Sequence, residues 1–255
     1  MTNKEMLCTA LKQSALELNC TVDDLTGGKS KAVISSTAEG ARKYLSLPFY
    51  CQLVSYGSGI VASVNEEIYA DAEAYIEKYA PEHCFETPNM LVLQSALERR
   101  GMSACFMAEY WLCDTDAIRM IDCGYELRLL TAEDFAPLYT PQWSNALCEK
   151  RKELDVLGIG AYDGEKLVGL AGCSADCESM WQIGVDVLPE YRRRGIASAA
   201  TGRLAAEIMA RGKVPFYCCA WSNVASARNA IRAGFRPVWV ELTAKSAEYT
   251  ADMNK

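Results

Sequence analysis

The chain has 255 residues, half of them hydrophobic, and a formal net charge of −7. This length suits two domains, and the apolar fraction is enough for a sizeable core. No apolar run approaches the roughly 20 residues of a membrane-spanning helix, so no membrane partner is expected. Residues 1–123 hold ten Lys or Arg and seventeen Asp or Glu, and this acidic first half argues against nucleic acid as a partner.

The N-terminal segment 1–19 is predicted to form an amphipathic helix, with Leu7, Leu11 and Leu18 on one face. It lacks the uninterrupted apolar core of a signal peptide, so a cytoplasmic protein is expected. In that compartment, the twelve cysteines should be mostly reduced thiols that fill core space.

Two glycine-rich segments in the first half are predicted to be turns. The segment 26–30 looks like the end of a P-loop, but Asp23 stands where that motif needs a glycine. The segment 57–62 loosely fits Gly-x-Gly-x-x-Ala, yet apolar stretches on both sides favour strand, turn and strand. An anion-binding turn that opens toward a helix starting near Asn65 stays as an alternative.

Two helices and a strand complete the first half. The first helix starts near Asn65, and the second runs from Thr87, a predicted cap, to Gly101. Residues 102–112 read as a strand. The first helix has an apolar face made by Ile68, Ala72, Tyr75, Ile76 and Tyr79. Residues 1–120 are therefore predicted to form an α/β domain of unknown role.

The only histidine, His83, stands next to Cys84. Side chains of sequence neighbours diverge, so a surface or half-buried histidine is expected here and not a nucleophile pair. The cysteines at 173 and 177 and at 218 and 219 lack a second ligand pair at zinc spacing. No metal is expected.

The second half begins near residues 114–124 and is predicted to alternate between strands and helices. A strand at 125–130 leads to a capped helix start at Thr131, and a hairpin follows over 157–173. Apolar and other residues then alternate from Trp181 to Val187, as in a strand.

The stretch after this strand carries the strongest chemical signal. A helix with an apolar residue every four positions, from Ile196 to Ile208, follows three arginines and Gly195. The first N–H groups of a helix have no partner inside it, and the helix dipole adds positive charge there. From Arg192 to Arg236 there are nine Lys or Arg and one acidic residue, Glu207. The pattern predicts a phosphate or pyrophosphate site.

The segment 187–197, with the sequence VLPEYRRRGIA, resembles the acetyl-CoA loop of the GNAT superfamily of N-acetyltransferases. The family pattern Arg/Gln-x-x-Gly-x-Gly/Ala is met at Arg192, Gly195 and Ala197. A second signature, Asn-x-x-Ser/Ala followed by Gly-Phe, is met from Asn223 to Phe235.

The resemblance covers residues 124–245. It implies an α/β (α+β) fold: a GNAT domain over 124–255 with a mixed, largely antiparallel central sheet flanked by helices, beside a smaller N-terminal α/β domain. A primary amine would attack acetyl-CoA, the co-substrate, directly in a ternary complex. In this family the pantetheine arm lies between two splayed strands.

The resemblance also implies a set of binding residues. The main chain of Val185 and Val187 would hold the acetyl group, and Asn223 would contact the pantetheine arm. The pyrophosphate would be cradled by Arg192, Arg193, Arg194, Gly195, Ile196, Ala197 and Ser198.

The proton-transfer groups are less well defined. Asp186, on the strand that would hold the acetyl group, is the first candidate for the base and Glu190 the second, with a surface carboxylate as the alternative for each. Many family members place a tyrosine seven residues after the asparagine, as the acid that protonates the departing thiolate. This chain has Ala230 at that position. The candidates left for the acid are water, Ser222 and Tyr217.

The expected function is acetyl transfer from acetyl-CoA to a primary amine of a small molecule. The alternative, suggested by Ala230, is an acyl-CoA-binding or regulatory module with weak or no transferase activity. A protein substrate is a third option. Homodimers are common among the proteins it resembles, which makes a homodimer a candidate assembly.

Overall fold

A computed structural model describes residues 1–255, which form two compact units. Unit 1 comprises Met1–Thr9 and Trp111–Pro237, and unit 2 comprises Ala10–Tyr110 and Val238–Lys255. The sequence-based boundaries at 1–120 and 124–255 differ from this division at both ends of the chain. A local pattern shows where a strand lies but not which distant strands it pairs with, and the last strand pairs with the first half.

Unit 2 contains a sheet in which β1, β3, β2, β10 and β4 follow one another. β1 is parallel to β3, whereas β2 is antiparallel to both β3 and β10. The elements that lie wholly or partly in this unit are α1 (Asn3–Leu18), α2 (Val22–Thr26), β1 (Lys31–Ile34), β2 (Cys51–Ser55), β3 (Val61–Val64), η1 (Glu66–Ile68), α3 (Tyr69–Lys78), η2 (Pro81–Phe85), α4 (Thr87–Glu98), β4 (Met102–Cys113), β10 (Phe235–Ser246) and α7 (Ala247–Met253).

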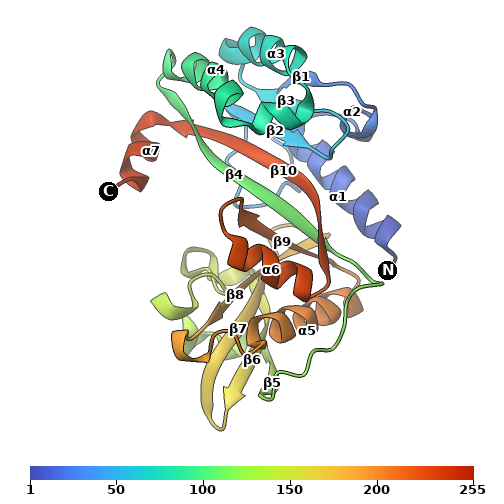
Figure 1. Cartoon of the computed structure of the whole chain (residues 1–255), viewed down its shortest axis with the longest axis vertical. Coiled ribbons are helices and arrows are strands. Elements are labelled where there is room, and N and C mark those ends of the chain that lie inside the picture. The colour runs from blue at the N-terminus through green and yellow to red at the C-terminus, as the bar shows by residue number, and fades with distance from the viewer. The chain divides into compact units, whose positions relative to one another are not determined.

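The core of unit 2 lies between its sheet and the helices α3 and α4 (Figure 1). Leu53 and Ala62 from the strands and Ile76 and Leu97 from the helices are almost completely buried in it. Four of the five residues predicted for the apolar face of the first helix are buried, and Tyr79 packs against this core half-buried.

A buried ion-pair group joins distant segments of unit 2. The guanidinium of Arg42 lies 2.7 Å from a Glu17 oxygen and 3.0 Å from a Glu241 oxygen, and Gln52 donates to Glu241 over 3.0 Å. All four side chains are buried. The group gives a physical reason why β10 belongs with the N-terminal helix, although more than 200 residues separate the two in sequence.

Local predictions in unit 2 are largely confirmed. β2 and β3 form an antiparallel pair around the turn at Gly57, which has a φ of +93°. The chain leaves α2 through a turn and enters β1, so no helix follows the P-loop-like segment. The cap predicted at Thr87 is wrong: Thr87 is already the first residue of α4, and Glu86 stands at the N-cap position without a side-chain capping hydrogen bond.

Unit 1 holds a second sheet region with the order β9, β8, β7, β6 and β5. Its strands pair antiparallel except for β8 and β9, which are parallel. Its remaining elements are β5 (Glu126–Thr131), η3 (Ala132–Asp134), η4 (Ala136–Leu138), η5 (Pro141–Trp143), η6 (Glu149–Leu154), β6 (Asp155–Asp163), β7 (Lys166–Ser174), β8 (Met180–Val187), η7 (Pro189–Tyr191), α5 (Ile196–Ala210), β9 (Val214–Ala220) and α6 (Val224–Arg232).

The helix predicted after Thr131 is not an α-helix. The predicted cap is present, because Thr131 and Asp134 form a reciprocal capping box, but only short 3-10 turns follow. Pro137 and Pro141 lack the N–H groups that a continuous helix would need.

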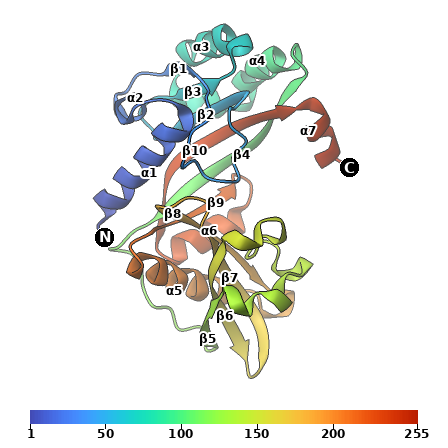
Figure 2. The ribbon, with the colours of Figure 1, turned by 180° about the vertical axis from the view of Figure 1, so that it is seen from behind.

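The strands of unit 1 are covered on both faces. α5 and α6 lie on the face turned toward the viewer in Figure 1. The segment 132–154, with its 3-10 turns, lies on the opposite face, which Figure 2 shows in front. None of the helices in the structure combines the length and the apolar character that crossing a bilayer would require.

Candidate functional site

The two parallel strands of unit 1, β8 and β9, separate partway along their length. The pairing between β8 and β9 runs from Met180 and Val214 to Ile183 and Tyr217, and no further. Both strands continue, β8 to Val187 and β9 to Ala220. The main chain of residues 184–187 is therefore not paired with β9, and a gap opens beyond Tyr217.

The gap leads to the start of α5. Gly195 caps this helix with a left-handed φ of +84°, and Arg193 also has a positive φ of +63°. Gly195 adopts this conformation without steric cost because it has no Cβ. No side chain caps the helix, so the first N–H groups, from Ile196 to Ser198, point outward.

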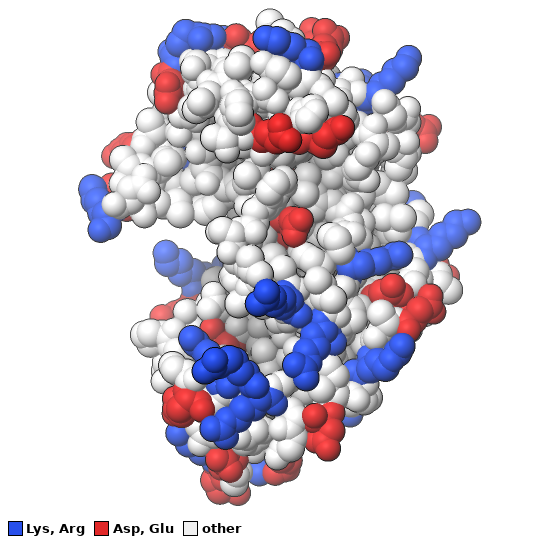
Figure 3. All heavy atoms as spheres, viewed as in Figure 1, with Lys and Arg blue, Asp and Glu red and all other residues white.

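Two of the three arginines hold the loop in shape. Arg192 donates to the carbonyl of Val187 over 3.1 Å. Arg194 donates to the hydroxyl of Tyr125 over 2.7 Å and to the carbonyl of Glu190 over 3.1 Å. Each guanidinium has five N–H groups, so both keep further donors for an anion. Basic side chains gather over α5 and α6 on this face (Figure 3).

Sequence reasoning missed Arg232, at the end of α6. A side chain at position 195 would come within 3.8 Å of Nη2 of Arg232, so this guanidinium lies beside the glycine of the loop. The basic excess between 192 and 236 pointed to the region. Only the packing of α6 beside α5 singles out this arginine.

Polar side chains connect α5 and α6. Ser198 donates to Asn229 over 3.0 Å, and Asn229 donates to Thr201 over 3.2 Å. The side chain of Ser198 thus points to α6, and only its main chain is left for an anion. Asn223 caps α6 by accepting from the N–H of Ser226 over 3.1 Å.

Asp186 anchors a loop on the opposite face of the sheet. Its carboxylate accepts from the main-chain N–H of Asn145 (2.8 Å), from the side-chain amide of Asn145 (2.7 Å) and from the N–H of Ala146 (3.0 Å). A Cβ at Gly184 would overlap the carbonyl of Asn145, and one at Gly172 would overlap that of Ala146. These glycines let the loop lie directly on β7 and β8.

The other predicted residues lie along the same strand and loop. Val185 and Val187 are half-buried on the face of β8 opposite to Asp186. Val187 packs in the small core that contains Ile196. Glu190 is exposed and lies 3.2 Å from the Lys166 ammonium. Its own backbone N–H and Lys166 lower the pKa of this carboxyl.

A second carboxylate, not identified from the sequence, is buried at the start of β6. Asp155 is 2 % exposed, and burial raises its pKa to about 6, against the opposing effect of hydrogen bonds from Cys148 N–H (2.8 Å) and Tyr139 hydroxyl (3.2 Å). Its partners come from loops that approach only in the folded chain, so no local pattern marks it.

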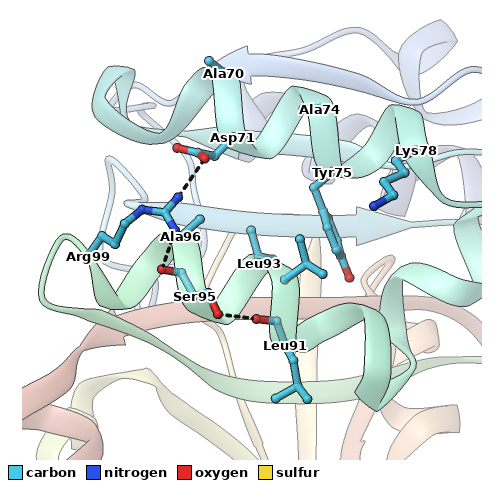
Figure 4. A pocket seen from close by; sticks show the side chains of 11 residues that line it. Ala70, Asp71, Ala74, Tyr75, Lys78, Leu91, Leu93, Ser95, Ala96 and Arg99 are labelled. Carbon is cyan, nitrogen blue, oxygen red and sulfur yellow. Dashed lines mark hydrogen bonds and ion pairs between the residues drawn. The ribbon is translucent and has the colours of Figure 1, made fainter.

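Unit 2 contains a groove of about 700 Å³ between α3 and α4. Figure 4 shows Tyr75 and Leu93 lining it, with Asp71 and Arg99 in contact at one end. None of the residues expected to bind acetyl-CoA lines it.

The chain contains no group of three or more His, Cys, Asp or Glu placed to hold a metal ion. His83 is half-exposed and lies 3.0 Å from Glu86, whereas the thiol of Cys84 points to the carbonyl of Tyr79.

The geometry of unit 1 can be compared with known proteins. A family model described as GNAT acetyltransferase matches residues 103–239. A search of curated proteins finds no match. Solved structures that resemble the chain include a putative GNAT-family acetyltransferase from Novosphingobium aromaticivorans, 23% identical, which covers 56% of this chain and 66% of that one with a TM-score of 0.45.

Two further structures resemble it. A GCN5-related N-acetyltransferase from Sphaerobacter thermophilus is 16% identical and covers 74% of this chain and 72% of that one, with a TM-score of 0.46. An aminoglycoside N-acetyltransferase in complex with CoA is 18% identical and covers 44% of this chain and 88% of that one, with a TM-score of 0.35. The match spans just under two thirds of the Novosphingobium protein. Because the family model matches more than half of the residues of this chain, the chain belongs to the GNAT acetyltransferase family.

Proposed function

We propose that this protein transfers an acetyl group from acetyl-CoA to a primary amine of a small molecule, by direct attack in a ternary complex. The observation that carries the proposal is the gap between β8 and β9, which opens beyond Tyr217 and leads to the uncapped start of α5. Membership of the GNAT acetyltransferase family supports acyl transfer as the chemistry.

In this proposal the gap holds the pantetheine arm and the helix start holds the pyrophosphate. The N–H groups of residues 196–198 face the anion, and Arg192, Arg193 and Arg194 add positive charge. Arg232 extends the basic surface from α6. The free edge of β8 at Val185 and Val187 offers main-chain groups to the acetyl carbonyl, and its N–H groups can stabilise the oxyanion.

The base remains a prediction, with Asp186 and Glu190 as its candidates. Both oxygens of Asp186 already accept hydrogen bonds from the 145–146 loop, which favours a role in positioning that loop. Glu190 is exposed and paired with Lys166. Asn223 is the proposed contact for the pantetheine arm at the start of α6.

The first test is calorimetric titration of acetyl-CoA into the full-length protein. Wild type is expected to bind acetyl-CoA with a dissociation constant in the micromolar range, which corresponds to a binding free energy of about −8 kcal/mol. A variant with Arg194→Glu and Gly195→Asp should lose binding, because it places two carboxylates where the pyrophosphate would lie. The matched control carries Arg211→Glu and Gly212→Asp at the other end of the same helix and should bind as wild type does. No binding by folded wild type would refute the proposal.

The alternative is an acyl-CoA-binding module without transferase activity, which Ala230 favours. Release of free CoA thiol from acetyl-CoA, measured with a panel of small amines, separates the two. Tight binding without amine-dependent release would support the module and contradict the transferase.

A further inference from the structure

Position 230 of α6 lacks a hydroxyl, yet a hydroxyl reaches the same face of this helix from a strand. Ala230 is completely buried and lies four residues after Ser226, so both positions share one face of α6. The hydroxyl of Tyr217, on β9, lies 2.7 Å from Oγ of Ser226. A phenol is therefore present next to the helical face that would have carried the missing tyrosine.

Tyr217 also stands at the point where the two strands part. It is the last β9 residue paired with β8, opposite Ile183, and its side chain lies on the face covered by α5 and α6. The pantetheine arm, held in the gap with its pyrophosphate at the far end, would bring its sulfur toward this point. The phenol and the sulfur would then lie at the same end of the gap.

We propose that Tyr217 is the group that donates a proton to the departing thiolate of CoA, with Ser226 holding its hydroxyl in place. The inference rests on the proposed acetyl transfer. In this proposal, Tyr217 on β9 takes the role that the family resemblance implies for a tyrosine at position 230 of α6.

The amine nitrogen bonds to the acetyl carbonyl carbon, the carbon–sulfur bond breaks, and its electron pair goes to sulfur. The phenolic proton of Tyr217 moves to sulfur and yields the free thiol of CoA. The phenolate then regains, through the hydroxyl of Ser226 and solvent, a proton equivalent to the one that the amine loses.

The surroundings of Tyr217 suit a proton donor. The side chain is buried, and burial raises the pKa of its phenol against the opposing effect of side-chain hydrogen bonds with Ser226 and Asn229, so the hydroxyl keeps its proton at neutral pH. Ser226 can donate to the phenolic oxygen, which leaves the phenolic proton available.

The test compares the affinity of CoA with that of desulfo-CoA, which lacks the sulfur, in full-length protein. The quantity measured is the ratio of the two dissociation constants in wild type, Tyr217→Phe and the control Tyr69→Phe. If the hydroxyl of Tyr217 donates to sulfur, Tyr217→Phe should reduce the preference for CoA by about two- to tenfold. Tyr69 lies in unit 2, and its substitution should leave the ratio unchanged.

Turnover supplies a second readout once an amine that supports CoA release is found. Tyr217→Phe should lower it by about 100-fold, and adding Ala230→Tyr should restore part of the loss by returning a hydroxyl to α6. An unchanged ratio in folded Tyr217→Phe overturns the inference. Failure of wild type to bind CoA at all would instead refute the proposed function.

Should Tyr217→Phe fail to fold, Ser226 gives an independent comparison. Ser226→Ala removes the group that orients the phenol and should reduce the preference for CoA, whereas Ser226→Thr keeps a hydroxyl and should preserve it. Equal ratios in these two variants would contradict the inference.

Discussion

Asp186 accepts two hydrogen bonds from Asn145, one from its main-chain N–H at 2.8 Å and one from its side-chain amide at 2.7 Å. This contact joins the C-terminal end of β8, the proposed acetyl-binding strand, to a loop on the other face of the sheet. The first candidate for the base therefore also positions this loop.

Replacing Asp186 by Asn should lower the free energy of unfolding by about 1–3 kcal/mol, because an amide NH₂ would face N–H donors. Denaturant titration measures this, with Glu190→Gln, an exposed carboxylate, as a control that should change little. Turnover should also fall. A pH–rate profile that loses its acidic limb would support Asp186 as the base. A profile that keeps its shape would leave Asp186 only the role of holding the 145–146 loop.

Gly184→Ala should displace the 145–146 loop. The added Cβ would overlap the carbonyl of Asn145, and relief of that overlap should cost about 1–3 kcal/mol of stability. Unfolding experiments should show no such loss for Gly202→Ala in α5, where an added Cβ would meet nothing closer than 3.5 Å at an ordinary helical φ. Equal losses in the two variants would show that the close approach has no energetic effect.

Asp155 should make stability depend on pH. Because burial raises its pKa to about 6, its contribution to stability is fully present below its unfolded-state pKa and is lost as the pH rises through about 6. The side chain of Asn can still accept hydrogen bonds from Cys148 and Tyr139 and does not ionise. The free energy of unfolding of Asp155→Asn, relative to that of wild type, should therefore rise by about 2–3 kcal/mol from pH 4 to pH 8. The measurement is chemical unfolding at both pH values, with Glu133→Gln as an exposed control. A stability difference between Asp155→Asn and wild type that is the same at both pH values would contradict a raised pKa of Asp155.

Arg42→Met should destabilise unit 2 by about 3–5 kcal/mol, because it leaves Glu17 and Glu241 buried without their counter-ion. Lys43→Met removes an exposed charge next to it and should cost little. Equilibrium unfolding of both variants checks this. A loss no larger than that of the control would mean that the buried group does not hold β10 to α1.

The sequence by itself determined the local elements of the phosphate-binding region. Alternation predicted the strand ending at Val187, and the apolar residue at every fourth position predicted the helix that starts at Ile196. Each depends on neighbours within a few residues. The same locality explains the error after Thr131, where the capping signal was correct but the prolines beyond it ended the helix.

Only the tertiary structure decided which groups meet. It placed Arg232 beside Gly195, brought the hydroxyl of Tyr217 to Ser226, and assigned Val238–Lys255 to unit 2. These contacts join segments whose approach depends on strand pairing and helix packing. Side-chain periodicity shows which face of an element is buried but not what covers it, so these relationships appear only once the chain is folded.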